Sequence, residues 1–175
     1  MIFTKTSING LYVIELEPKI DERGYFLRVF CQTEFKNAGL DYNIINTNRS
    51  FSRHKGTIRG LHFQKEPMAE VKIVQCLRGR IFDVVVDLRT ESPTYKQWFG
   101  IELTENNNKM LYVPKGFAHG IQTLSDNCIL EYFINQFYSP QHEGGFLWND
   151  PAFKIIWPLP VSVMSERDRK WRLFN

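Results

Sequence analysis

Apolar and polar residues follow one another in short runs along most of this chain, and clusters of Gly, Pro and Asn separate the runs. Runs that are rich in aromatic and β-branched residues and bounded in this way are typical of β-strands. Their close spacing predicts an all-β fold, a sandwich or barrel, in a single domain over residues 1–175. The clearest runs are 11–16, 24–30, 71–77, 81–88, 98–103 and 128–134.

Helical signals are few. Thr33 is expected as the N-cap of a short helix with the body 34–38, and Gly39 as its left-handed stop. No alternation of strands and helices follows, which argues against a parallel nucleotide-binding sheet. Residues 150–164, rich in Pro and aromatics, predict an extended strap over the body, and 165–174 predict a last helical turn or two.

The parity of residues along two strands identifies a possible interior cavity, because alternate residues of a strand share a face. Lys72 shares its face with Val74 and Cys76, and Tyr132 shares its face with Leu130. If these faces point into a barrel, an ammonium and a phenol become polar tips in a lined cavity. Parity does not decide between this arrangement and a Lys72 that faces solvent.

Composition and charge narrow the class of protein. Hydrophobic residues make up 43% of the 175 positions, as in a globular domain, and the net charge of +3 is too small to indicate nucleic-acid binding. The 3 cysteines lie far apart, so neither a disulfide framework nor a thiolate metal site is indicated. No signal peptide and no membrane-spanning run is visible, and we expect a cytoplasmic protein without membrane or nucleic-acid partners.

Two segments carry histidines in patterns that suggest chemistry. Arg59 and His62 lie three residues apart, and guanidinium groups bind phosphate in bidentate fashion. The segment 114–120 has the Pro-x-Gly-x-x-His spacing of the second cupin signature, ending at His119. The first cupin signature is only partly echoed downstream of His62, where Gln64 replaces a histidine. A glutamine amide is a poor metal ligand.

A metal site formed by His62, Glu70 and His119 is therefore an alternative interpretation, in second place. A metal-dependent oxygenase or isomerase is the function that this site would imply.

A longer series of motifs covers nearly the whole chain in order. These are DERGYF (21–26), the spaced Asn46-x-Asn48-x-Ser50, GTIRGLHFQ (56–64), residues 71–89, SPTYKQW (92–98), PKGFAHGIQTL (114–124), YFINQFYSP (132–140), WNDPAFKIIWP (148–158) and SERD (165–168). Together they resemble the dTDP-4-dehydrorhamnose 3,5-epimerase family, a metal-independent branch of the cupins. The resemblance implies a cupin-type jelly-roll barrel with a few short peripheral helices. It also implies a homodimer, and a nucleotide-sugar substrate handled without metal or organic cofactor.

The resemblance further implies residue roles. His62 is the base, held by Asp168, Tyr132 is the acid on the opposite face, and Lys72 with Arg59 surrounds the C4 oxygen and the diphosphate. Removal of a proton next to a ketone leaves negative charge on its oxygen, which explains the need for a near-neutral base and a cation. The residues matched to the nucleotide and sugar pocket are Arg23, Phe26, Asn46, Asn48, Ser50, Arg59, His119, Tyr138 and Glu143.

Several assignments stay open at this stage. Tyr138 has the same parity as Tyr132, so either phenol could donate the proton. The pattern from Ser165 to Asp168 also fits a helix cap, in which Asp168 would only hold a backbone amide. Asp83 and Asp87 share one face of their strand, and one of them could orient His119, whereas Asp87 equally fits a structural partner of Arg89. A basic cluster could suggest nucleic-acid binding, but we disfavour that interpretation. Its residues are Arg49, Arg53, His54, Lys55 and Arg59.

Departures from the family pattern leave the base and the sugar open. Arg28 stands where a glutamate is common, and Met68-Ala69-Glu70 replaces a more usual His-Ala-Gln. A 3-epimerase, a 3,4-ketoisomerase on the same scaffold and a non-catalytic sugar-nucleotide-binding cupin remain alternatives.

Overall fold

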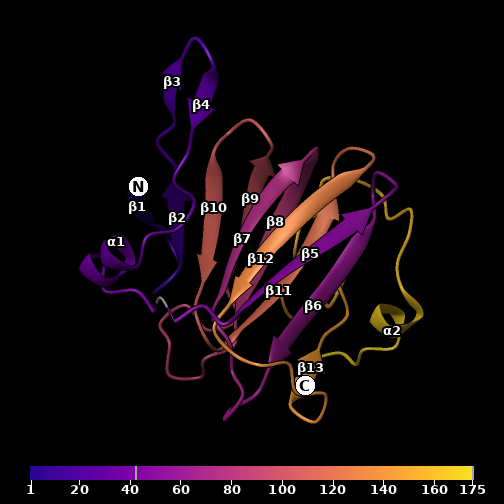
Figure 1. Ribbon diagram of the computed structural model, residues 1–175. Helices are drawn as coiled ribbons and strands as arrows, with labels where there is room; N and C mark the ends of the chain where they lie inside the picture. The colour runs from indigo at the N-terminus through magenta and orange to yellow at the C-terminus, as the bar shows by residue number, and fades with distance from the viewer. Residues whose placement is uncertain (42, 175) are drawn as a thin grey trace.

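Two antiparallel sheets form the body of the molecule (Figure 1). The computed structural model describes residues 1–41 and 43–174. The six-stranded sheet has the order β1-β2-β10-β7-β12-β5, and the five-stranded sheet has the order β13-β6-β11-β8-β9. The strands of the first are β1 (Ile2–Lys5), β2 (Tyr12–Glu15), β5 (Asn46–Ser52), β7 (Lys72–Arg78), β10 (Lys109–Val113) and β12 (Cys128–Ile134). Those of the second are β6 (Ile58–Gln64), β8 (Arg80–Asp87), β9 (Trp98–Thr104), β11 (Phe117–Thr123) and β13 (Glu143–Gly145).

The main core lies between these two sheets. Val74 and Cys76 of β7 and Leu130 of β12 pack there against Val85 of β8 and Ile121 of β11, all of them buried. Alternation along each strand gives these side chains a common face, as the parity of the sequence predicts, and the structure shows that this face points inward. The all-β prediction of a cupin-type jelly-roll barrel is confirmed.

A second cluster covers part of the outer face of the six-stranded sheet. The helix α1 (Gln32–Asn37) places the fully buried Phe35 against this cluster. The predicted N-cap at Thr33 is wrong: Cys31 is the N-cap, without a side-chain hydrogen bond, and Thr33 lies inside the helix. Burial of Phe35 sets the position of this short helix in place of local capping. Gly39 adopts φ +70° just after the helix, as predicted.

The predicted run 24–30 is a strand over only part of its length. Residues Gly24–Phe26 form β4, which pairs with β3 (Lys19–Asp21) in a hairpin that projects from the body (Figure 1). Leu27 and Val29 leave the hairpin and pack against the cluster around α1. This packing ends the strand early. The other five predicted runs are strands, within two residues at either end.

The C-terminal segment crosses the body as an extended strap. Gln122 of β11 donates to and accepts from the backbone of Leu159, at 2.7 and 3.0 Å. Val163 accepts the backbone N–H of Ile58 at 3.0 Å. The strap leads into α2 (Glu166–Arg169), the short terminal helix that the sequence predicts. No helix in the described ranges has the length and apolar character needed to cross a membrane.

Gly60 allows β6 to approach β11 closely. Its φ is +106°, and a Cβ at this position would lie 2.5 Å from the carbonyl oxygen of His119. Only glycine fits both the backbone conformation and the space. The close approach brings His62 directly opposite His119 in the strand register.

Candidate active site

A cavity of about 480 Å³ opens between the two sheets and beside α2. This volume is in the usual range for a small-molecule site. Strands β5, β7 and β12 supply one wall, β6 and β11 the other, and α2 closes one side. The lining residues are Asn48, Ser50, Arg59, His62, Lys72, His119, Ile121, Tyr132, Ile134, Ser165, Arg167 and Asp168. Lys72 therefore faces the cavity, which answers the question that strand parity left open.

His62 and Asp168 form an imidazole–carboxylate pair at one wall. Nε2 of His62 lies 2.5 Å from Oδ1 of Asp168, and Oδ2 faces the backbone N–H of Gly60 at 3.4 Å. The carboxylate fixes the neutral tautomer with the proton on Nε2, so Nδ1 is the ring nitrogen that can accept a proton. The His62 side chain is 30% exposed, which leaves it accessible to a substrate.

The cap at the start of α2 positions this carboxylate. Ser165 Oγ accepts the backbone N–H of Asp168 at 3.0 Å, while the Asp168 side chain points to His62. The capping pattern is thus present, but the expectation that Asp168 only holds a backbone amide is wrong. Burial opposes ionisation of Asp168, and the hydrogen bonds from His62 and Gly60 outweigh it, so the pKa of Asp168 is lowered.

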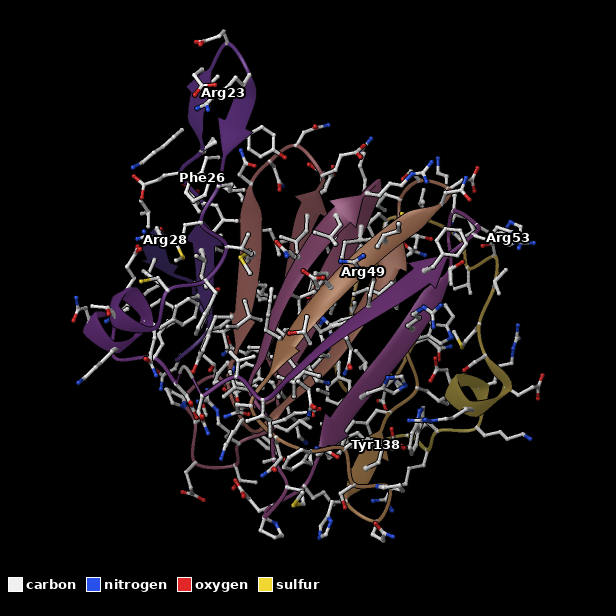
Figure 2. All side chains as sticks on the ribbon, viewed as in Figure 1. Arg23, Phe26, Arg28, Arg49, Arg53 and Tyr138 are labelled. Atoms are coloured by element: carbon white, nitrogen blue, oxygen red, sulfur yellow. The ribbon has the colours of Figure 1, made fainter. Side chains whose placement is uncertain are left out.

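Tyr132 lies in the cavity, and Tyr138 does not line it. The Tyr132 hydroxyl is 3.2 Å from Ser50 Oγ, and its ring meets the His119 ring edge-on, with centroids 6.2 Å apart. Burial raises the pKa of Tyr132, so the phenol is protonated at neutral pH. Tyr138 is 61% exposed and donates to Glu143 Oε2 at 3.1 Å, near β13 (Figure 2).

Besides two histidines, three basic side chains line the cavity, namely Lys72, Arg59 and Arg167. Lys72 Nζ is 2.9 Å from Glu70 Oε1. Arg59 donates from Nε to Ser52 Oγ and from Nη2 to the Phe51 carbonyl, both at 2.9 Å. These bonds fix the plane of the guanidinium.

Arg167 is a cavity residue that the sequence reasoning missed. It forms an ion pair with Glu143, and its guanidinium lies 5.7 Å from the centroid of the Trp171 ring. The available signal was its place inside the SERD motif, directly before Asp168.

A second imidazole–carboxylate pair lies deeper. Nε2 of His119 is 2.9 and 3.0 Å from the two carboxylate oxygens of Asp83, and both side chains are buried. Asp83 is therefore the strand aspartate that orients His119. Asp87 binds Arg89 instead, at 2.8 and 2.7 Å. Burial acts against ionisation of Asp87, but Arg89 and neighbouring hydroxyls lower its pKa to about 2.

Some predicted binding residues lie away from the cavity. Arg23 and Phe26 are on the projecting β3–β4 hairpin, where Arg23 binds Asp21 at 2.6 Å (Figure 2). Asn46 does not line the cavity, and its amide donates to the Gln136 carbonyl at 3.0 Å. Glu143 reaches the cavity only through its ion pair with Arg167.

The structure supports neither the nucleic-acid interpretation nor the alternative metal site. Arg49 pairs with Glu131 at 2.7 Å, on the sheet face opposite to Tyr132, whereas Arg53 lies at the far end of β5 (Figure 2). Glu70 binds Lys72, so it does not join His62 and His119 in the alternative ligand set. Within residues 1–41 and 43–174, no three His, Cys, Asp or Glu side chains are grouped so as to hold a metal ion.

The fold and the cavity define a cupin-type isomerase site, in which a paired imidazole and a phenol can exchange protons with one bound molecule. The family model described as dTDP-4-dehydrorhamnose 3,5-epimerase matches residues 5–175. This chain belongs to that family, as its motifs indicate.

Individual relatives agree with this assignment. The chain is 43% identical to the dTDP-4-dehydrorhamnose 3,5-epimerase of Methanothermobacter thermautotrophicus, over 97% of this chain and 92% of the relative. It is similar to the crystal structure of the Bacillus anthracis epimerase with TDP and PPi bound, with a TM-score of 0.96, 40% identity and 99% of each chain covered. It also resembles the Legionella pneumophila epimerase in complex with dTDP-4-keto-L-rhamnose, with a TM-score of 0.92, 36% identity and coverage of 98% and 92%.

Proposed function

We propose that this chain epimerises dTDP-4-dehydro-6-deoxy-D-glucose at C3 and C5 to dTDP-4-dehydro-L-rhamnose. The observation that carries the proposal is the presence of the His62–Asp168 pair and Tyr132 in one cavity. The solved relatives with TDP and with dTDP-4-keto-L-rhamnose support the substrate class. Carbons C3 and C5 both flank the C4 ketone, so one set of groups can act on each in turn.

The first step is proton removal. His62 Nδ1 takes the proton from the carbon next to the ketone, and the electron pair moves to the C4 oxygen as an enolate. Lys72 stabilises this oxygen, and Asp168 stabilises the imidazolium that forms. A positioned base contributes about 10²–10⁴-fold to the rate of such a step.

The second step is proton return from the opposite face. The enolate electron pair returns to the carbon as the C4 ketone re-forms, and Tyr132 donates its phenolic proton to that carbon, which inverts the centre. The imidazolium of His62 then releases its proton to solvent, and the Tyr132 phenolate takes one up. The raised pKa of Tyr132 keeps its proton available before the enolate forms. Because Tyr138 lies outside the cavity lining, we assign the acid to Tyr132.

Basic side chains at the cavity hold the rest of the nucleotide sugar. We assign the diphosphate to Arg59 and Arg167, because guanidinium groups bind phosphate oxygens in pairs. Asn48 and Ser50 on β5 face the same space and can bind sugar hydroxyls. No metal or organic cofactor is needed for either proton transfer.

The projecting hairpin supports a homodimer. It exposes Ile20, Tyr25 and Phe26, which are 79%, 70% and 66% accessible. Apolar surface of this kind is usual at an interface between subunits. We propose that the hairpin packs on a second copy in the cytoplasm and that Arg23 and Phe26 complete the nucleotide pocket of that copy.

The direct test is incubation with dTDP-4-dehydro-6-deoxy-D-glucose and product analysis by NMR. Formation of the L-rhamno product supports the proposal, and unchanged substrate contradicts it. A product inverted at C3 only, or a 3-keto sugar, would replace it by the narrower alternatives. The same assay with other nucleotides in place of dTDP tests whether Arg28 alters base recognition.

A further inference from the structure

Glu70 lies behind Lys72, and both oxygens of its carboxylate are engaged. Oε1 is 2.9 Å from Lys72 Nζ, and Oε2 accepts from the Gln64 side-chain amide at 3.2 Å. The Lys72 and Glu70 side chains are only 14% and 12% exposed, so this pair is largely withdrawn from water. An ion pair with little solvent contact holds its geometry better than a surface pair does.

Gln64 is itself a rigid support for Glu70. Its buried amide nitrogen, which carries two hydrogens, is also within hydrogen-bond distance of the carbonyl oxygens of Met68 and Phe137, at 2.9 and 3.1 Å, so three acceptors share its two donors. Its oxygen accepts the backbone N–H of Ser139 at 2.6 Å. Glu70 is therefore linked through Gln64 to the backbone of two separate segments, at Met68 and at Phe137 and Ser139.

Lys72 needs such an anchor. A lysine ammonium is a point charge on a flexible four-carbon stem, with three N–H donors. One donor points to Glu70, which leaves the others for the cavity that Lys72 lines. The other carboxylates in or near the cavity are bound to other basic side chains: Asp168 to His62, Asp83 to His119 and Glu143 to Arg167.

We propose that Glu70 is a positioning residue for epimerisation, which fixes the Lys72 ammonium beside the C4 oxygen and acts only through Lys72. The inference rests on the proposed function. Glu70 is not among the side chains that line the cavity, so we expect it to act without contact to the substrate. Its negative charge weakens the field of Lys72, but a preorganised donor is worth about 10²–10³-fold in kcat, so we expect positioning to dominate.

The test compares Glu70→Ala with Glu70→Gln in the full-length protein. Glu70→Gln keeps an oxygen that can accept from Lys72, so we expect kcat within about threefold of wild type. For Glu70→Ala we expect kcat to fall about tenfold, a modest part of the effect of losing the donor itself. The dissociation constant of dTDP, measured by calorimetry, should change by less than about twofold in both variants. The reason is that Lys72 is assigned to the C4 oxygen of the sugar, which dTDP lacks.

A double-mutant cycle separates positioning from general damage. In a Lys72→Ala background, Glu70→Ala should cause no further loss of deuterium exchange at the sugar, because the partner through which it acts is gone. A full additional loss, or Glu70→Ala at wild-type kcat, would overturn the inference.

A readout without substrate distinguishes this inference from the proposed function. NMR of the Lys72 ammonium should show restricted motion in the wild type and free motion in Glu70→Ala, whatever the protein catalyses. Equal mobility in the two proteins overturns the positioning role. Absence of epimerised product with the wild type contradicts the proposed function instead.

Discussion

Two imidazole–carboxylate pairs of the same chemistry stand side by side at this cavity. His62 on β6 lies opposite His119 on β11 in the strand register. The first pair takes its carboxylate from α2, and its imidazole is 30% exposed. The second takes its carboxylate from the neighbouring strand β8, and its imidazole is 7% exposed. The difference lies in access and in the origin of the carboxylate.

This difference teaches that a His–Asp pair alone does not define a base. The His62 side chain keeps an accessible part because its partner carboxylate comes from a separate segment, α2, beside the cavity. His119 and Asp83 are fixed within one sheet, and the Tyr132 ring packs against His119. We interpret the second pair as support for the cavity wall and for the orientation of Tyr132.

The largest contrast is expected between His62→Ala and His119→Ala. Loss of the base should lower kcat by about 10³–10⁴-fold, at the upper end for a positioned base. His119→Ala should lower kcat by about tenfold at most, a change of about 1.4 kcal/mol in the activation barrier, because His119 only supports the cavity wall and the orientation of Tyr132. Steady-state kinetics with the 4-keto sugar nucleotide measures both. Equal losses of kcat would remove the distinction between the pairs.

Substitution of the two carboxylates should show the same contrast as substitution of the two imidazoles, with the larger loss of kcat at the His62–Asp168 pair. Asp168→Asn should lower kcat by about 10²-fold, because an amide can turn its NH₂ toward Nε2 and favour the wrong tautomer. Asp83→Asn should lower the free energy of unfolding by about 1–3 kcal/mol, the cost of disturbing a buried hydrogen-bonded group, with a smaller change in kcat. Kinetics and urea denaturation on the same two variants supply the comparison. A stable Asp83→Asn protein with kcat reduced 10²-fold would contradict it.

The smallest expected effect is on how the free energy of unfolding depends on pH. The folded-state pKa of Asp168 is lowered, so its stabilising contribution is present above the unfolded pKa of about 3.9 and is lost as pH falls through the folded value. The difference in unfolding free energy between wild type and Asp168→Asn should therefore shrink below about pH 4. For Asp87→Asn, whose carboxyl has a folded-state pKa of about 2, the corresponding difference should shrink progressively between about pH 4 and about pH 2. A difference between wild type and Asp168→Asn that stays constant below about pH 4 would contradict the lowered pKa of Asp168.

Much of the site was predictable because it depends on local pattern. Strand parity groups Lys72 and Tyr132 with apolar residues on one face of their strands, and the family resemblance of the motifs around His62 and Asp168 implies the paired base. The structure was needed to show that Lys72 faces the cavity. The parts that were missed depend on contacts between distant segments. The Glu70–Lys72 pair and the cavity position of Arg167 require the strand register and the docking of α2, and the N-cap at Cys31 follows from burial of Phe35.

The most direct test of the central claim is deuterium incorporation at C3 and C5 of the sugar nucleotide in D₂O, followed together with inversion. If His62 removes the proton and Tyr132 returns one from the opposite face, Tyr132→Phe should still exchange both positions with retention, and His62→Ala should show neither exchange nor inversion. The wild type should show both. Continued inversion by Tyr132→Phe, or native-rate exchange by His62→Ala, would contradict the account.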